Sequence, residues 1–448
     1  MVWSRVGFGA ARCALGVAEH EAALVRALQG GVTVVDTNAN YMGGKSEELV
    51  GKVVRKVFGD EGNEKAKILT KFGYASSSSG RHPGMVTAAT GLSHSMHPDF
   101  MCKELERSLQ RLQTKTVEGF LVENPEHHLT HRLQSAGAMA SGNDGEGIGV
   151  VAPFTRIQLN EVREAFYGDM TSLFEAMEER VDEGQVRAYG VSSTGLSLPD
   201  KEPLHISWEA LVQCAREAAK RRGKVTHSFK IVQMPANLLE TTGLKEAPSM
   251  EAAGIRVMAC HPLTASMPNG TFQLVDDALR GDLPHDYMDV CRQVLEHFTM
   301  DLPEGRELTE EESDIIQGCR FLQQLVKDMN SQLVSFTSFE HYEVELAGSI
   351  TPMINNKFEG LDATSADILQ AFFERYGAMV RYSCAQRTRD MVVSGEGCPS
   401  GAHVIPDDET LQHYALRWLV HQPGVGCTVV DMENPQDVDN TMLTIQAS

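Results

Sequence analysis

Apolar residues recur along the chain with two spacings, and the two spacings alternate. Short apolar runs rich in β-branched residues predict buried strands, whereas longer stretches with apolar residues three and four positions apart predict helices. The predicted strands lie near residues 6, 33, 69, 119, 188, 231, 257 and 428. The predicted helices cover residues 20–29, 46–57, 98–112, 168–183, 207–222, 250–254, 408–420 and 435–443. Eight strands that alternate with helices predict an α/β fold, a (β/α)8 TIM barrel, whose active site lies at the carboxyl ends of the strands.

Three segments interrupt this alternation. Residues 74–97 are polar and rich in serine and glycine, which predicts a loop or lid. Residues 135–150 have low complexity and many glycines, so we expect a mobile insertion there. Residues 264–407 have no regular strand alternation. Helical patterns occupy residues 287–298, 311–329 and 366–378 of that segment. We therefore expect a single domain over residues 1–448, with loop insertions at about 74–97, 127–158 and 264–407.

Composition narrows the classes of partner. The 448 residues include 40 basic and 61 acidic ones, which gives a formal charge of −21 and an isoelectric point near 5.2. Such a charge repels phosphate backbones and anionic lipid, so nucleic-acid and membrane-surface partners are not expected. The nine cysteines are scattered without a CxxC pair, which is typical of reduced thiols and predicts no zinc or other metal site. No apolar run approaches the ~20 residues of a membrane helix, and we expect a soluble, cytoplasmic protein.

The stretch after the second predicted strand contains the first candidate catalytic residues. Asp36 ends the apolar run at 32–35, Tyr41 follows five residues later, and Ser46 is a plausible N-cap of the next helix. An acid and a phenol at the carboxyl end of a strand suit proton transfer in an α/β enzyme. A capped strand-to-helix turn with a buried tyrosine explains the same residues.

Other strand ends also deliver ionisable groups. Lys71 ends the third predicted strand and Glu123 ends the fourth. The first strand ends in Gly7-x-Gly9, but arginine at position 12 removes the third glycine of a dinucleotide fingerprint, which argues against a Rossmann fold.

Polar residues at the strand ends form an ordered pattern that spans residues 5 to 445. It comprises Asp36 and Tyr41, Gly43-x-x-Ser46-Glu47, Thr70-Lys71, Asn124-Pro125-Glu126, Gly190-Val191-Ser192, Gln233, Pro262-Leu263, and Asn434-Pro435 with Asn440. With this pattern the chain resembles the aldo-keto reductase superfamily. The spacing of the first motif is similar to that of the L-galactose dehydrogenase-like branch.

The resemblance implies a division of roles at the barrel mouth. Members of the family transfer a hydride from a nicotinamide dinucleotide to a carbonyl carbon and protonate the oxygen from a tyrosine. By position, Tyr41 is the expected general acid, Lys71 the cation that lowers the pKa of the phenol, and Asp36 the carboxylate that keeps Lys71 charged and placed. A buried ion pair without a catalytic role is the alternative for Lys71 and Asp36.

Glu123 departs from the family pattern, which places histidine before Asn-Pro. A few relatives with glutamate there reduce a carbon–carbon double bond next to a ketone, because a protonated carboxyl can polarise the carbonyl. The alternatives for Glu123 are a site that reduces carbonyls slowly and a site that does not reduce them.

The resemblance also implies a set of cofactor contacts. They are Gly9, Ser192, Ser193, Gln233, His261, Pro262, Leu263, Asp431, Met432 and Asn440. Ser193 stands where asparagine is usual, and the position that often stacks on the nicotinamide falls near Cys260 or His261. The last strand and its loop offer acids, Asp431 and Glu433, where a lysine or arginine often holds the 2′-phosphate of NADPH. Acids repel that phosphate but can bind ribose hydroxyls, so we expect NAD(P)H as cofactor with NAD(H) at least as good as NADP(H).

Two functions stay open at this stage. The first is an NAD(P)-dependent oxidoreductase that acts on a small-molecule carbonyl or enone. The second is a catalytically weak or inactive barrel that serves as a binding or regulatory subunit, with residues 264–407 as the surface for a protein partner. The sequence names no substrate, because specificity in this fold resides in the strand-end loops.

Overall fold

Contacts within the chain divide it into two compact units. The computed structural model describes residues 3–76, 80, 82–136, 156–268, 270–279, 283–299, 308–357 and 362–446. The first unit consists of Met1–Pro262 and Leu416–Ser448, and the second is Leu263–Ala415. The expectation of one domain over residues 1–448 stays a prediction. Most of the predicted mobile insertion at 135–150 lies outside the described residues.

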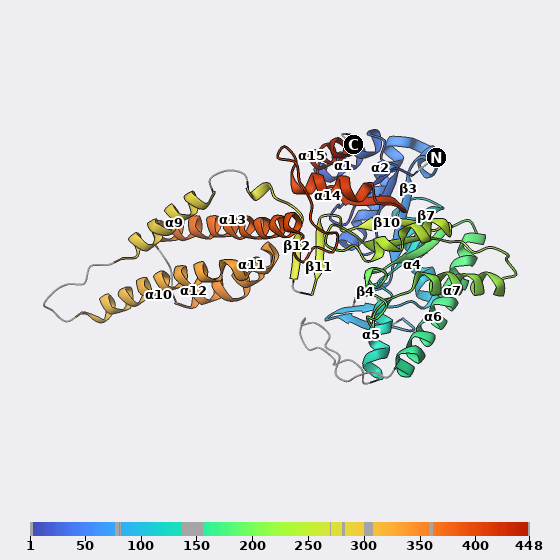
Figure 1. The fold of residues 1–448 in the computed structure, drawn as a ribbon, viewed down its shortest axis with the longest axis horizontal. Coiled ribbons are helices and arrows are strands. Elements are labelled where there is room, and N and C mark those ends of the chain that lie inside the picture. Colours follow the sequence, from blue (N-terminus) through green and yellow to red (C-terminus); the bar gives the residue numbers. More distant parts are fainter. Residues whose placement is uncertain are drawn as a thin grey trace. The chain divides into compact units, whose positions relative to one another are not determined.

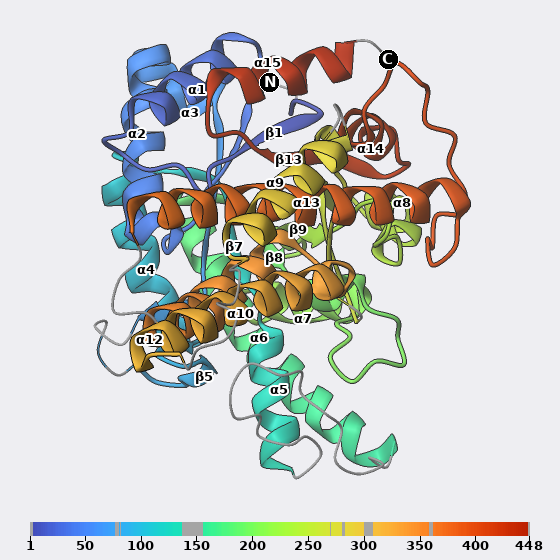
Figure 2. The ribbon, with the colours of Figure 1, turned by 90° about the vertical axis from the view of Figure 1, so that its left-hand side faces the viewer.

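The first unit is built on a closed barrel of eight parallel strands (Figures 1 and 2). The strands are β1 (Val6–Gly9), β2 (Val34–Asp36), β3 (Lys67–Phe72), β7 (Val117–Glu123), β8 (Val186–Ser192), β9 (Phe229–Pro235), β10 (Arg256–Cys260) and β13 (Val425–Asp431). Around the barrel they follow the order β1-β13-β10-β9-β8-β7-β3-β2. The predicted (β/α)8 TIM barrel is therefore confirmed, and each of its strands coincides with a predicted apolar run.

The barrel interior is filled by side chains, as a closed eight-stranded sheet requires. Apolar residues from six strands form its central cluster, namely Val34, Leu69, Leu121, Ile231, Met258, Cys427 and Val429. At the amino end of the strands the guanidinium of Arg256 lies 4.0 Å from the ring centroid of Trp3 and covers this cluster. The opposite, carboxyl ends of the strands carry the polar residues.

Helices follow the strands and surround the barrel (Figures 1 and 2). They are α1 (Ala18–Gln29), α2 (Lys45–Phe58), α3 (Gly62–Lys65), α4 (Pro98–Arg111), α5 (Glu126–Ser135), α6 (Arg156–Asp182), α7 (Trp208–Arg221), α8 (Ala247–Ala252), α14 (Leu411–Val420) and α15 (Pro435–Gln446). The prediction that Ser46 caps α2 is wrong. Gly44, with a φ of 89°, holds the cap position, and Ser46 is buried with its hydroxyl oxygen 2.8 Å from the carbonyl oxygen of Ala10.

The segment after β3 is more ordered than predicted. Residues 74–97 contain three short antiparallel strands, β4 (Tyr74–Ser76), β5 (Val86–Ala89) and β6 (Leu92–His94), paired in the order β4-β6-β5. The expected loop or lid is therefore a small sheet. Its strands have three or four residues each, which is too short for a convincing apolar alternation in the sequence.

The second unit is helical and has its own core. Its helices are α9 (Leu283–His297), α10 (Glu310–Gln332), α11 (Phe339–Glu345), α12 (Thr351–Lys357) and α13 (Ala363–Ser394), and α9 packs along α13 (Figures 1 and 2). Tyr342, Phe372 and Tyr376 lie at the centre of a buried apolar cluster. The segment 264–407 also begins with a hairpin of β11 (Thr264–Met267) and β12 (Gly270–Gln273), which the sequence did not predict.

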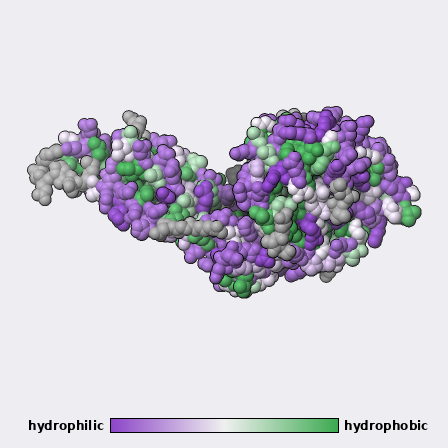
Figure 3. All heavy atoms as spheres, turned by 90° about the horizontal axis from the view of Figure 1, so that it is seen from above, coloured by the Kyte–Doolittle hydropathy of each residue, from purple (hydrophilic) through white to green (hydrophobic). Residues whose placement is uncertain are grey.

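On the face that Figure 3 shows, hydrophilic residues predominate in both units and hydrophobic residues stand in groups among them. Scattered exposed apolar side chains are normal for a folded protein and need no partner to explain them. None of the helices in the described part of the chain combines the length and apolar character that a membrane crossing requires.

Candidate active site

Three of the predicted catalytic side chains meet at the carboxyl ends of β2 and β3. The ammonium of Lys71 donates to Asp36 Oδ2 at 2.6 Å, to the carbonyl of Thr37 at 3.1 Å and to Tyr41 Oη at 3.1 Å. Lys71 and Asp36 are buried, with 1% and 4% of their surfaces exposed. The chain thus holds a charged lysine between a carboxylate and a phenol.

A tight turn between β2 and α2 presents Tyr41. Met42 and Gly43, with φ of 51° and 65°, turn the chain back immediately after the tyrosine, and Gly44 follows at 89°. A side chain at Gly44 would place its Cβ 2.9 Å from Arg111 Cδ, so the turn also needs glycine for space. The two glycines between Tyr41 and Ser46 therefore allow the turn that carries the phenol.

A buried carboxylate fixes this turn to the neighbouring elements. Glu47, in the first turn of α2, has no exposed surface and accepts hydrogen bonds from Arg111 of α4 and from the Thr70 hydroxyl of β3. Because Thr70 precedes Lys71, Glu47 connects the turn that holds Tyr41 to the strand that holds Lys71.

The charges at the site are set by burial and by one another. Burial is the largest single influence on the pKa of Lys71 and would lower it, but the charges of Asp36, Tyr41 and Glu123 and the hydrogen bond to Asp36 together raise it by more. The pKa of Lys71 therefore lies above its ordinary value, and the amine stays charged. Burial raises the pKa of Tyr41, and Lys71 opposes that rise. Lys71 thus acts to lower the pKa of Tyr41, as expected, but burial outweighs it, and the pKa of Tyr41 lies above its ordinary value. The phenol is protonated, and its oxygen accepts from Lys71.

Glu123 faces the same group from the end of β7. Its Oε2 accepts from Asn38 Nδ2 at 2.6 Å, and its charge is among the influences that raise the pKa of Tyr41. Burial raises the pKa of the Glu123 carboxyl, whereas Lys71 and the hydrogen bond from Asn38 lower it by less. The net effect is a raised pKa, which widens the pH range in which the carboxyl is the neutral acid that can donate a hydrogen bond.

The residues expected to bind a nicotinamide carboxamide form a chain that ends at Asp36. Ser192 Oγ donates to Gln233 Oε1 at 2.7 Å, and Gln233 Nε2 donates to Asp36 Oδ1 at 3.1 Å. Ser193 is not part of this chain, because its hydroxyl donates to Glu126 at 2.7 Å. Ser192 keeps acceptor capacity and Gln233 keeps one N–H, so these two side chains fit a carboxamide.

The end of β10 carries the residues expected near the nicotinamide ring. His261 is exposed and has a φ of 53°, and its carbonyl accepts from Asn237 Nδ2 at 3.1 Å. Burial, followed by the charge of Asp36, raises the pKa of the Cys260 thiol, so that thiol is protonated. Pro262 is buried. Leu263 is the first residue of the second unit.

Acids gather where β13 leads into α15. Gly9 of β1 pairs in register with Asp431, and a side chain at Gly9 would collide with the Asp431 carboxylate. Met432 is fully buried, so it offers only its main chain to a ligand. Asn440 is exposed and accepts from Gln436 at 2.9 Å. The first turn of α15 adds another acid, Asp437. Its carboxylate accepts hydrogen bonds from the amides of residues 433 and 434 at 3.0 and 3.3 Å.

Sequence reasoning missed several residues around the site. Asn38 lies two positions after Asp36 and so shares its face of the chain, which is a signal that could have found it. Arg12 reaches Glu433 across 3.5 Å and brings a cation to the acidic end of β13, although no basic residue is near Glu433 in the sequence. His94, whose ring nitrogen lies 2.6 Å from the carbonyl oxygen of Glu123, carries no sequence signal.

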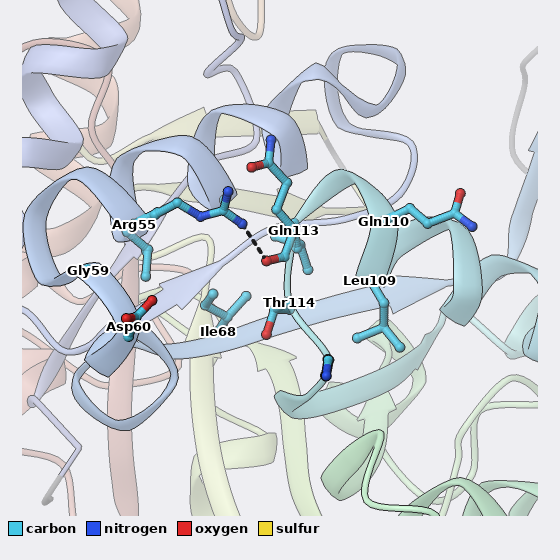
Figure 4. Close-up of a pocket in the computed structure, with 13 residues that line it drawn as sticks. Arg55, Gly59, Asp60, Ile68, Leu109, Gln110, Gln113 and Thr114 are labelled. Atoms are coloured by element: carbon cyan, nitrogen blue, oxygen red, sulfur yellow. Dashed lines mark hydrogen bonds between the residues drawn. The ribbon is translucent and has the colours of Figure 1, made fainter.

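Two open pockets of the first unit lie away from these residues. One, of about 570 Å³, lies near the amino ends of β3 and β7, where Arg55 donates to the carbonyl of Gln113 at 2.9 Å (Figure 4). The other, of about 750 Å³, lies among α5, α6 and the small sheet and includes His128. Neither is lined by Asp36, Tyr41, Lys71 or Glu123. In barrels of this kind the end where the first pocket lies serves stability.

Comparisons with known proteins bear on the barrel as a whole. The sequence model of the Aldo/keto reductase family matches residues 5–315. No curated protein matches the chain significantly. Assignment to the L-galactose dehydrogenase-like branch stays a prediction.

Three solved structures are similar at 15% identity. A glycerol dehydrogenase of Gluconobacter oxydans has a TM-score of 0.45 and covers 98% of this chain and 86% of its own. An aldo-keto reductase of Bacillus halodurans, in its holo form, has a TM-score of 0.44 with coverages of 100% and 88%. An aldo/keto reductase of Klebsiella pneumoniae in complex with NADP and acetate has a TM-score of 0.42 with coverages of 99% and 86%.

Proposed function

The chain belongs to the aldo/keto reductase family and is therefore an oxidoreductase, and we propose that it reduces a small-molecule carbonyl with NAD(P)H and with Tyr41 as proton donor. The observation that carries this proposal is the position of Lys71, 2.6 Å from Asp36 and 3.1 Å from the phenol oxygen of Tyr41. A buried ion pair without a catalytic role would not require the phenol of Tyr41 as a third partner.

Each side chain then has one task. Bound NAD(P)H supplies the hydride that reduces the carbonyl carbon. Tyr41 accepts a hydrogen bond from Lys71, so its own proton is free to move to the carbonyl oxygen of the substrate. Lys71 stabilises the phenolate that remains, and Asp36 keeps Lys71 charged and in place. Ser192 and Gln233 hold the carboxamide of the nicotinamide.

Reduction of an enone is a second candidate, and Glu123 favours it. A neutral carboxyl that is held by Asn38 can donate a hydrogen bond to a ketone oxygen, which makes the adjacent double bond more electrophilic.

The turnover of cyclohex-2-enone, compared with that of 4-nitrobenzaldehyde, tests whether the protein reduces enones. Glu123→Leu, which removes the hydrogen-bond donor, should lower enone turnover at least about tenfold more than aldehyde turnover. Equal effects on the turnover of both substrates would exclude enone reduction as the function of Glu123.

We propose that NADH binds at least as tightly as NADPH. The 2′-phosphate of NADPH would meet Asp431, Glu433 and the Asp437 carboxylate at the amino end of α15, whereas Arg12 is already paired with Glu433. Like charges repel that phosphate, and acids can accept hydrogen bonds from the ribose hydroxyls of NADH.

Fluorescence titration with each nucleotide tests both the cofactor and its preference. Asp437→Asn keeps a capping side chain but removes its charge, so it should improve NADPH binding about threefold to tenfold and leave NADH binding within about twofold. Clearly tighter NADPH binding by the unchanged protein would overturn the preference. Binding of neither nucleotide would overturn the reductase proposal and support a binding or regulatory barrel.

A further inference from the structure

The small sheet β4-β6-β5 is attached to the residue that ends β7. The pairing of β3 with β7 reaches Phe72 and Val122, one residue before Glu123. The Glu123 carbonyl instead lies 2.6 Å from Nε2 of His94, a fully buried residue at the end of β6. The main chain under a proposed active-site carboxyl is thus held by a side chain from an inserted sheet.

The hydrogen bonds define the protonation of two histidines. A carbonyl only accepts, so His94 Nε2 carries a proton and donates it. Nδ1 of His94 then offers a lone pair, and Nε2 of His128, 3.1 Å away, donates to it. Burial lowers the pKa of His94 to about 3 and that of His128 to about 4, so both rings are neutral, as this arrangement requires.

The chain makes space for this contact at a glycine. Gly73 follows the last residue of β3 with a φ of 150°. A Cβ at this position would collide with His94 Nε2 and would lie 2.8 Å from the Glu123 carbonyl oxygen. Any larger residue would separate the two groups.

A second attachment fixes the next residue. Asn124, with a φ of 46°, donates through Nδ2 to Tyr74 Oη at 2.7 Å, and Tyr74 Oη lies 3.0 Å from His127 Nε2. The rings of Tyr74 and His94 pack edge to face at 5.3 Å. Both residues at the end of β7 are therefore held by the small sheet.

We propose that His94 is a positioning residue, which holds the end of β7 so that the half-buried Glu123 carboxyl stays in its place beside Lys71 and Tyr41. The inference rests on the proposed function in one respect, the role of Glu123 as a hydrogen-bond donor to substrate. Without the His94 donor the Glu123–Asn124 peptide keeps the hydrogen bond from the Asn124 amide to the Ser192 carbonyl, 2.7 Å long, but loses the contact that fixes its carbonyl, so the peptide can tilt and carry the side chain with it. The carboxyl then ionises more readily.

A pair of variants separates this role from simple packing. Glutamine places its N–H near the position of His94 Nε2, whereas asparagine, one methylene shorter, places it near Nδ1. His94→Gln should therefore keep the bond to Glu123, and His94→Asn should lose it. The readout is the infrared C=O band of the protonated carboxyl, assigned by its loss in Glu123→Gln and titrated with pH. Lys71, Asp36, Glu126 and Tyr41, which also face Glu123, are unchanged in both variants.

The expected midpoint of the band falls by at least one pH unit in His94→Asn, a tenfold change in proton affinity, and by less than half a unit in His94→Gln. Equal midpoints in the two variants and the unchanged protein would overturn the inference, as would a Glu123 carboxyl that is ionised throughout. The band needs neither cofactor nor substrate. A protein that shows these shifts but no turnover would refute the proposed reaction and leave the positioning role intact.

Discussion

Lys71 is the residue on which the charge balance of the site depends. A buried ammonium tolerates loss of water only while a carboxylate compensates for it, and Asp36 does so at 2.6 Å. The same pair that keeps Lys71 charged would be costly if either member lost its partner. The ion pair can therefore be tested through stability as well as through turnover.

Lys71→Met should lower the free energy of unfolding by about 3 kcal/mol, because it leaves the Asp36 carboxylate buried without a compensating cation. The double variant Lys71→Met/Asp36→Asn should regain most of that loss, since asparagine is neutral and can still accept from Gln233. Both variants should have lost reductase activity. Urea denaturation of the single and double variants measures the coupling. A double variant no more stable than Lys71→Met would show that the two charges do not compensate each other.

A residue of the site could be predicted from the sequence where it stands at the end of a recognisable apolar run. Asp36, Tyr41, Lys71 and Glu123 were predictable because each stands at the end of an apolar run, and the ends of parallel strands meet. Arg12 and His94 were not, since their partners lie 421 and 29 positions away and no local pattern connects them. The same limit applies to Ser193, whose contact with Glu126 follows from the closure of the barrel.

At the scale of elements, the barrel strands and the small sheet differ in how well the sequence predicts them. The barrel strands are buried on both faces and therefore give continuous apolar runs. The strands at 74–76, 86–89 and 92–94 have little apolar content, and the polar contacts of Tyr74, His94 and Asn124 help to hold them. Side-chain hydrogen bonds of this kind leave no periodic signal.

Buried neutral histidines make the small sheet sensitive to acid. The folded-state pKa values of His94 and His128, about 3 and about 4, lie below the unfolded value near 6.5. Their contribution to stability is thus present above pH 6.5 and is lost as the pH falls toward 3. Between pH 7 and pH 4 the free energy of unfolding of the unchanged protein should fall by about 3 kcal/mol more than that of His94→Gln. Urea denaturation at each pH measures this difference. Parallel pH curves for the two proteins would contradict this account.

At the scale of the whole molecule, each unit has the apolar core that independent folding stability requires. The barrel encloses one cluster, and the helices from α9 to α13 enclose another around Phe372 and Tyr376. All the proposed catalytic residues and every cofactor residue except Leu263 belong to the first unit. The two units should therefore respond differently to ligands.

Calorimetry of the full chain should resolve two unfolding transitions, and saturating NADH should raise only one of them. A ligand at a hundred times its dissociation constant adds about 2.7 kcal/mol to the state that binds it. Limited proteolysis during the melt would identify the transition, because the barrel should be the part that NADH protects. A single transition, or equal protection of both units, would contradict this division of the molecule.

The central claim, that Tyr41 protonates the carbonyl oxygen in an NAD(P)H-dependent reduction, is tested most directly by turnover of Tyr41→Phe with saturating nucleotide and an aromatic aldehyde. Loss of a positioned general acid costs about 100-fold to 10,000-fold in rate. The account predicts a loss in kcat of at least about 100-fold, with the dissociation constant of the nucleotide unchanged within about twofold. Wild-type turnover by Tyr41→Phe would contradict it.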